Sequence, residues 1–264
     1  MILPLYDNRY FSSIAQHFES EARRRGLFAI VSCTNRDPKQ ECEAARMMLA
    51  YRVECLVCTG ATDPDTIAQM CAESGVQSIN LDLPGSKAPS VISNNRDGAR
   101  QLTHAILNRL TEEKRSDDPV LFIGGRDEDH NTRERIAGFK QAREEVGLAT
   151  AEENILPCDY AADKAQAALE TYMRNRSTLP SAMFVNSTIS LEGIVRGLQL
   201  NGYYLDDIIF GCFDWDPLAA AFHPRLMMVR QNVIEMIDRV FKLIDTPPRD
   251  PQLLIEVQPE IMGV

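Results

Sequence analysis

The stretch FSSIAQHFESEARRRGLFAIVSC, from Phe11 to Cys33, is the most informative part of this sequence for its fold. Its first half repeats apolar residues at intervals of four, the spacing of one buried helix face: Ile14, Phe18 and Ala22. Gly26 then supplies a residue suited to a left-handed helix C-cap, and the apolar run from Phe28 to Cys33 follows at once. A helix that leads directly into a buried strand is typical of α/β proteins.

The same alternation of short apolar runs and longer segments of helical period extends along the whole chain. The short runs predict strands at residues 2–5, 28–33, 55–59, 78–81, 91–93, 120–124, 154–157, 182–185 and 208–213, with a last strand at 253–261. Helices are predicted between them at residues 11–25, 38–51, 63–74, 97–110, 133–145, 161–174, 187–200 and 233–244. This order predicts βαβ units around parallel sheets.

Two α/β runs follow one another along the chain, although neither an internal repeat nor a Gly/Ser linker separates them. We therefore expect an α/β protein with two doubly wound parallel-sheet lobes joined by three crossovers. The N-terminal lobe is predicted to comprise residues 1–95 and 232–247, and the C-terminal lobe residues 96–231 and 248–264.

Composition and charge restrict the possible functions. The chain has 264 residues, of which 44% are apolar and 25% charged, so an ordered globular protein is expected. Its net charge of −10 has the wrong sign for a surface that binds nucleic-acid phosphates. No stretch approaches the roughly 20 apolar residues of a membrane span, and the first residues lack the features of a signal peptide. The prediction is a cytoplasmic protein without membrane contact.

The cysteines and the familiar catalytic motifs argue against metal or enzymatic chemistry. Seven cysteines form an odd set, mostly within apolar runs, so no structural disulfide is expected. Cys55 and Cys58 lie in a strand-like run without a second pair at zinc spacing, which favours core packing over a metal or redox site. The sequence lacks G-x-S-x-G, G-x-x-x-x-G-K-[ST] and H-E-x-x-H motifs. We therefore expect no catalytic residues, no metal and no cofactor.

Seven short motifs, in order along nearly the whole chain, resemble the effector-binding domain of the lactose-repressor family of bacterial transcription regulators. They are DNRYF (7–11), ESEARRRG (19–26), RVECLVC (52–58), NNRDGA (94–99), RERIAGF (133–139), FD (213–214) and MVRQ (228–231). That domain is similar to the type I periplasmic sugar-binding proteins. Residues 180–193 and 208–216 look most like the fructose-repressor branch, whose effectors are phosphorylated sugars.

The resemblance implies a ligand-sensing domain that binds a sugar or sugar phosphate between its lobes, at the C-terminal ends of the strands. Effector binding would shift lobe closure and thereby operator affinity. The upstream helix-turn-helix domain of the family is missing from this chain, so DNA contacts would belong to that missing domain. An alternative is a sugar-binding protein of a transport or chemoreceptor system.

Regulators of this kind read two half-sites as a dimer, so a homodimer is expected. The predicted helix at residues 39–51 carries two apolar stripes, whereas a helix on a lobe surface needs only one. The second stripe is the candidate dimer contact: Ala44, Met47 and Tyr51.

In the first lobe, three residues at predicted β-to-α turns match ligand positions of the family. Tyr10 and Phe11 follow the first strand, where an aromatic ring can pack on a sugar, although Phe11 can equally attach its helix to the lobe. Asp82 follows a strand and can accept hydrogen bonds from two hydroxyls, or it can form the turn before Pro84 and Gly85.

In the second lobe, Arg135 matches a family arginine that forks onto a hydroxyl pair or an acidic group. The alternative is a surface arginine paired with Asp129 or a neighbouring glutamate. Arg126 and Arg133 lie near it in sequence and would suit an anionic effector if the three gathered, although interleaved acidic residues favour a charge-balanced surface. His130, just before this helix, is a further candidate.

The remaining candidates follow later strands of the second lobe: Tyr160, Asn186, Asp214, Trp215 and Gln231. Asn186 and Asp214 end strands directly, so their side chains are expected at the ligand. Tyr160 and Trp215 can each either stack on a sugar or pack in the protein interior. Gln231 lies on a crossover between the lobes.

Overall fold

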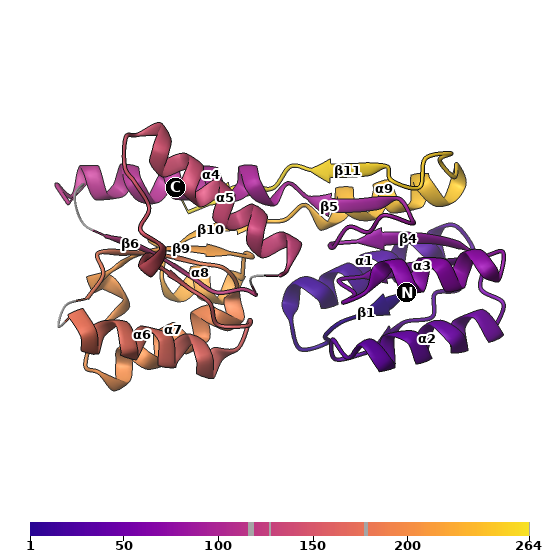
Figure 1. The fold of residues 1–264 in the computed structure, drawn as a ribbon, viewed down its shortest axis with the longest axis horizontal. Helices are drawn as coiled ribbons and strands as arrows, with labels where there is room; N and C mark the ends of the chain where they lie inside the picture. Colours follow the sequence, from indigo (N-terminus) through magenta and orange to yellow (C-terminus); the bar gives the residue numbers. More distant parts are fainter. Residues whose placement is uncertain (116–118, 127, 177–178, 264) are drawn as a thin grey trace. The chain divides into compact units, whose positions relative to one another are not determined.

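The computed structural model describes residues 1–115, 119–126, 128–176 and 179–263. The chain divides into two compact units, one of residues 1–93 and 232–257 and the other of residues 94–231 and 258 onward. Each unit contains one sheet with helices on both faces (Figure 1). The chain passes from one unit to the other three times. The prediction of two doubly wound α/β lobes joined by three crossovers is confirmed.

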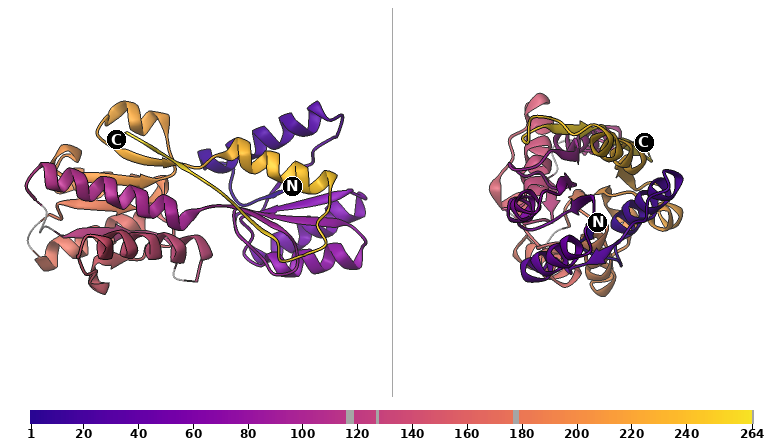
Figure 2. Two further views of the ribbon diagram at one scale, coloured as in Figure 1. Left: turned by 90° about the horizontal axis from the view of Figure 1, so that it is seen from above. Right: turned by 90° about the vertical axis from the view of Figure 1, so that its right-hand side faces the viewer.

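The first unit has a parallel sheet in the order β11-β5-β4-β3-β1-β2. Its strands are β1 (Ile2–Leu3), β2 (Ser32–Cys33), β3 (Cys55–Thr59), β4 (Gln77–Leu81), β5 (Ser90–Ser93) and β11 (Leu254–Val257). Its helices are α1 (Arg9–Arg24), α2 (Pro38–Ala50), α3 (Pro64–Glu73) and α9 (Val233–Asp245). Helices α1 and α9 lie side by side over one face of the sheet (Figure 2), while α2 and α3 pack against each other.

The second unit has the sheet order β12-β10-β9-β8-β6-β7. Its strands are β6 (Val120–Ile123), β7 (Ile155–Leu156), β8 (Ala182–Val185), β9 (Ile209–Phe213), β10 (Met227–Arg230) and β12 (Glu260–Met262). Its helices are α4 (Asn95–Glu112), α5 (His130–Glu145), α6 (Ala162–Arg176), α7 (Thr188–Leu200) and α8 (Pro217–Phe222). All the pairings are parallel except that of β10 with β12, which is antiparallel.

The C-terminal segment differs from the sequence-based prediction. Instead of one strand over residues 253–261, the structure has β11 beside β5 in the first unit (Figure 1). A separate strand, β12, pairs with β10 in the second unit. Pro259 lies between β11 and β12, and a proline has no N–H to continue a ladder. Residues 248–257 accordingly belong to the first unit, whereas the predicted boundary assigned them to the second lobe.

The predicted strand over residues 28–33 is also shorter in the structure. Only Ser32 and Cys33 pair with β1, and the Phe28 side chain is 93% exposed. This segment is at the edge of its sheet, where one side of the strand has no neighbour to bury its side chains. The apolar run therefore predicted a strand in this segment correctly, but it suggested that the side chains are more buried than they are.

Helix boundaries follow the signals in the sequence. Asn8 caps α1 by accepting hydrogen bonds from the backbone N–H groups of the first turn, and Gly26 follows the helix at φ +74°. Asp37 caps α2 with Pro38 as its first residue, as predicted. Asp129 caps α5 through its side chain and the Thr132 N–H. The start of α5 is thereby held at the end of the β6 loop.

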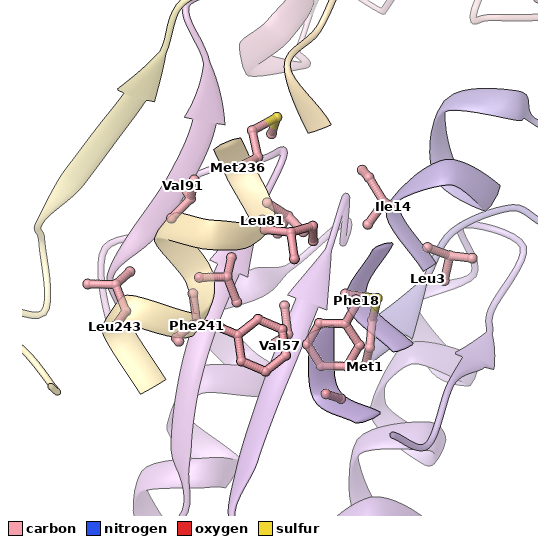
Figure 3. Packing of buried hydrophobic residues seen from close by; sticks show 14 of the residues in the cluster. Met1, Leu3, Ile14, Phe18, Val57, Leu81, Val91, Met236, Phe241 and Leu243 are labelled. Atoms are coloured by element: carbon pink, nitrogen blue, oxygen red, sulfur yellow. The ribbon is translucent and has the colours of Figure 1, made fainter. Parts of the chain in front are cut away.

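Alternate residues of each central strand face opposite helix pairs. In the first unit, one cluster joins the sheet to α1 and α9, and the rings of Phe18 and Phe241 lie 5.2 Å apart within it (Figure 3). In the second unit, Phe122 and Phe184 face α4 and α5, whereas the next residues along β6 and β8 face α6 and α7. The apolar side chains of the strands fill these cores. The polar residues that follow the strands are positioned by the turns in which they lie.

Candidate functional site

Polar side chains occur where the central strands of the second unit end. Asn186 follows β8, Asp214 follows β9, and Gln231 follows β10. Because these strands are parallel, their carboxyl ends meet at one edge of the sheet, which is where open α/β sheets bind ligands. Asn186 and Gln231 are buried, and Asp214 is half-buried.

Arg135 reaches this edge from α5 and is only 3% exposed. Its Nε donates to Asn95 Oδ1 at 2.8 Å, and its Nη1 donates to the Asn186 carbonyl oxygen at 2.8 Å. The guanidinium carbon also lies 3.6 Å from the centre of the Phe213 ring. Among the described residues, Nη2 has no hydrogen-bond partner. The alternative of a surface ion pair with Asp129 is wrong, because the side chain is buried against neutral groups.

Two glycines allow the turn after β6 to approach these residues. Gly125 has a φ of +79°, and a Cβ at this position would lie 2.2 Å from Thr132 Oγ1. A Cβ on Gly124 would lie 2.6 Å from the Asn186 Cβ. Only glycine combines the positive φ with this close contact, so the Gly-Gly pair brings the start of α5 against the end of β8.

Tyr160 connects the turn after β7 to the start of α5 and to the end of β8. Its hydroxyl lies 2.9 Å from Thr132 Oγ1, accepts from Asn186 Nδ2 at 3.1 Å and donates to Asp129 Oδ2 at 2.9 Å. Burial raises the pKa of Tyr160 well above its usual value, so the hydroxyl keeps its proton at neutral pH. Tyr160 also has a φ of +54°, a strained conformation of the kind found at ligand sites. We interpret Tyr160 as a residue that orients Asn186.

Asp214 and Gln231 form a pair between the ends of β9 and β10. Gln231 Nε2 donates to Asp214 Oδ1 at 2.5 Å, and Asp214 has a φ of +74°. Gln231 Oε1 is buried and has no partner among the described residues. Trp215 is half-buried, packs against the core beneath α7 and lies 5.8 Å from the Arg230 guanidinium. His130 is half-buried at the first residue of α5.

In the first unit, the structure brings Tyr10 and Asp82 together. The Tyr10 hydroxyl donates to Asp82 Oδ1 at 2.9 Å, and Asp82 is 4% exposed with a φ of +74° directly after β4. Phe11, a residue of α1, is buried in the core that α1 forms with α9 and the sheet. This is the packing role that the sequence offered as the alternative to ligand contact. The Arg36 guanidinium lies 5.5 Å from the centre of the Phe11 ring.

Three residues of the site were missed by the sequence analysis: Asn95, Asn131 and Thr132. Asn95 Nδ2 donates to Asn131 Oδ1 at 3.0 Å, and Asn95 also accepts from Arg135. Asn95 belongs to the NNRDGA motif, which carried the family resemblance without indicating a role. The motif therefore pointed to Asn95. No local pattern pointed to Thr132, because its partner Tyr160 is 28 residues away in the sequence.

The Tyr10–Asp82 hydrogen bond leads to a test of the first unit. Tyr10→Phe removes one half-buried hydrogen bond and is expected to lower the free energy of unfolding by about 1 kcal/mol. Chemical denaturation followed by circular dichroism measures this change. Tyr51→Phe is the control, since Tyr51 is 67% exposed and should tolerate the loss of its hydroxyl. Equal stability of the two variants would contradict the role of the bond.

Similarity to known sequences agrees with this geometry. Residues 1–222 match the sequence model of a family described as periplasmic binding protein domain. The chain belongs to this family. The ribitol operon repressor of Klebsiella aerogenes is 53% identical over 126 residues, about half the length of each protein. The transcriptional repressor PurR of Vibrio campbellii is 26% identical over 99% of this periplasmic binding protein domain and 78% of the repressor.

Solved structures share the fold of this periplasmic binding protein domain. The Cra regulator of Pseudomonas putida, in complex with fructose 1-phosphate, has a TM-score of 0.83 at 21% identity, over 99% of this chain and 96% of the other. A Burkholderia thailandensis protein that is described as a ribose operon repressor has a TM-score of 0.83 at 22% identity, over 100% of this chain and 97% of the other. The relatives with substantial sequence identity are repressors, so the resemblance to the lactose-repressor family is confirmed.

Among the described residues there is no group of three or more side chains suited to hold a metal ion. Cys55 and Cys58 lie in β3, where burial raises the pKa of Cys55 to about 12. A thiol in this state is neither a good nucleophile nor a metal ligand. None of the helices in the described ranges is both long enough and apolar enough to span a bilayer.

Proposed function

We propose that this chain is the ligand-sensing domain of a bacterial transcription regulator, and that its ligand is a small sugar or a sugar-derived compound. The observation that carries the proposal is the buried guanidinium of Arg135, which three hydrogen bonds hold at the ligand end of a parallel sheet. Its Nη2 atom has no hydrogen-bond partner among the described residues. A ligand hydroxyl at Nη2 would accept a hydrogen bond from a charged donor, and such bonds contribute more than neutral ones. The relatives that are repressors favour a regulator over a transport or chemoreceptor protein.

The proposed signal is a shift between conformations of the domain. An effector that binds one conformation more tightly than another shifts their populations by that difference in affinity. Asn95 and Gln231 lie directly at two of the chain's three passages between the units, and each contacts a proposed ligand residue, Arg135 or Asp214. Contact with DNA belongs, in this proposal, to a further domain, and the protein works in the cytoplasm.

A thermal-shift screen tests ligand binding directly. The panel contains neutral sugars, polyols including ribitol, sugar phosphates, sugar acids and nucleosides. At a hundredfold excess over its dissociation constant, a ligand adds about 2.7 kcal/mol to the free energy of unfolding. That increase corresponds to several degrees in Tm. If no compound in the panel raised Tm, the proposed sensing function would be contradicted.

We also propose that the domain forms a homodimer through the exposed stripe of α2. Met47 and Tyr51 are 58% and 67% exposed, whereas Ala44, in the same predicted stripe, is buried. Large apolar side chains exposed close together on one helix commonly mark a protein contact. The contact is therefore centred on Met47 and Tyr51.

Met47→Asp is expected to weaken this dimer at least tenfold, because a carboxylate would be buried in an apolar contact. Light scattering across a concentration series measures the dissociation constant. Glu43→Asp is a control on the same helix that keeps its charge and its exposed position. A monomer at tens of micromolar for the unchanged chain would contradict the proposed contact.

A further inference from the structure

A hollow of about 480 Å³ lies at the edge of the second unit, between strand β7 and helix α6. None of the residues that line it belongs to the candidate effector site. Two features leave this space unfilled: β7 is the last strand of its sheet, and α6 lines the hollow with the small side chains of Ala167 and Ala168. The volume is within the usual range of small-molecule sites, about 300 to 1,000 Å³.

Tyr172 brings a buried polar group to this hollow. The residue is 8% exposed, and its hydroxyl has no hydrogen-bond partner among the described residues. Burial raises the pKa of Tyr172, an effect that Arg176 opposes and Glu153 reinforces. The hydroxyl therefore lies within electrostatic reach of both charged side chains and keeps its proton at neutral pH. A protonated phenol in this place is a hydrogen-bond donor that a ligand can use.

Two opposite charges lie together at the rim of the hollow. Arg176 Nη2 donates to Glu153 Oε1 at 2.5 Å, and the Arg176 guanidinium carbon lies 5.6 Å from the centre of the Tyr172 ring. The Arg176 and Glu153 side chains are 45% and 67% exposed. Because an exposed ion pair contributes little to stability, both groups can bind a ligand at small cost. The rim offers one cation and one anion, so it favours a ligand that carries one charge of each sign.

The floor of the hollow is apolar. Leu156 and Pro157 form it from the side of β7, and Ala167 and Ala168 form it from the side of α6. A ligand with an apolar side chain removes these alkyl groups from water, which is favourable. A polyhydroxy compound would bring mainly polar groups against the same floor. The floor therefore favours a ligand with an aliphatic or aromatic side chain.

We propose that this hollow is a second ligand site, and that its ligand is an apolar α-amino acid bound as a zwitterion. The carboxylate of the amino acid accepts hydrogen bonds from Arg176 and from the Tyr172 hydroxyl, and its ammonium group donates to Glu153. Its side chain packs against Leu156 and Ala168. A simple anion would face the Glu153 carboxylate, and a simple cation would face the Arg176 guanidinium. The proposal goes beyond the sensing function and does not depend on it.

Three compounds with the same side chain test the need for both charges. L-Leucine carries both, 4-methylpentanoate lacks the ammonium group, and 3-methylbutylamine lacks the carboxylate. We expect L-leucine to bind with a millimolar Kd and both analogues to bind several-fold more weakly, because each loses one charge-assisted hydrogen bond. Nuclear magnetic resonance titration of the isotope-labelled chain measures each Kd. The amide signals of residues 153–157 and 167–176 should shift most.

Tyr172→Phe separates ligand binding from folding. It removes a hydroxyl that has no partner among the described residues, so the free energy of unfolding should change little. The affinity for L-leucine should fall about twofold to tenfold, because one hydrogen bond to the ligand is lost. Tyr203→Phe is the matched control in the same unit, since Tyr203 is 37% exposed and lies outside the hollow. It should change neither quantity.

Ala168→Leu fills the hollow from α6. Leucine is nearly as good a helix former as alanine, and the Ala168 side chain faces the hollow, so the fold should persist. Binding of L-leucine should be lost. Ala72→Leu makes the same change at an exposed position of α3 in the first unit and should leave binding intact.

The outcomes decide the proposal. Binding of L-leucine at these residues that exceeds the binding of both analogues, and that Tyr172→Phe weakens without loss of stability, supports it. Equal or tighter binding of 4-methylpentanoate or 3-methylbutylamine would overturn the zwitterion. If L-leucine failed to bind up to its solubility limit, or still bound to Ala168→Leu, the site itself would be overturned. None of these results bears on effector binding at the carboxyl ends of the strands.

Discussion

Arg135→Ala is expected to weaken effector binding by about 1.5 to 3 kcal/mol, a factor of about 10 to 150 in dissociation constant. The substitution removes Nη2, the one guanidinium nitrogen without a partner among the described residues, and with it the proposed ligand contact. It also removes the group that holds the Asn186 backbone at the strand end. Calorimetric titration with the compound found by thermal shift measures the loss.

Stability should fall as well, but less than the number of lost contacts suggests. Removing the guanidinium leaves Asn95 Oδ1 and the Asn186 carbonyl oxygen without this donor, and it ends the contact with Phe213. Against these losses, the folded protein no longer buries a charge that has no carboxylate within hydrogen-bonding distance. We expect a net decrease of about 2 kcal/mol in the free energy of unfolding.

Arg133→Ala is the matched control, because it deletes the same side chain two residues earlier on the exposed side of α5. Surface substitutions of this kind usually change stability by less than about 0.5 kcal/mol. Arg135→Lys adds information, since a lysine keeps the charge but lacks the planar fork and should not restore affinity. If Arg135→Ala folded normally and bound effector as tightly as Arg133→Ala, the proposed role of Arg135 would be refuted.

Gly138→Ala should destabilise the second unit by about 3 kcal/mol, although alanine is normally the better helix former by about 1 kcal/mol. A Cβ at Gly138 would lie 2.1 Å from the Arg96 carbonyl oxygen and 2.9 Å from the Arg100 nitrogen. Both atoms belong to the backbone of α4, so relief requires separation of the two helices rather than a change of rotamer. Urea denaturation followed by circular dichroism measures the effect.

The same substitution should also weaken effector binding, because Arg135 lies one helical turn before Gly138 on α5. Gly197→Ala in α7 is the control for helix propensity. A Cβ there would meet the Gln166 Cγ at 3.3 Å, a flexible side chain that can move slightly. That variant is expected to be neutral or slightly stabilised. Equal stability of the two variants would show that the close approach of α4 and α5 is not required.

Much of the fold follows from the sequence alone. Apolar periods and caps are local properties: Ile14, Phe18 and Ala22 marked a helix face, and Asp37 with Pro38 marked a helix start. The regular alternation of strand and helix implied parallel sheets, because a parallel pair requires a crossover connection. Arg135 could be proposed because it lies within the RERIAGF motif, and Asn186 and Asp214 because each directly follows a strand, so a short segment is enough to indicate them.

Tertiary structure decided the features that depend on distant segments. The terminal apolar run at residues 253–261 became two strands because β5 and β10 each offered a free edge and Pro259 interrupted the ladder. Phe11 was placed in the core by α9, more than 200 residues away in sequence. The Tyr160 hydroxyl meets Thr132, Asn186 and Asp129 only because two glycines let separate turns approach one another. The local sequence determines the periodicity of apolar residues and the capping of helices. The partners of a buried polar group depend instead on which turns the assembled sheet brings together.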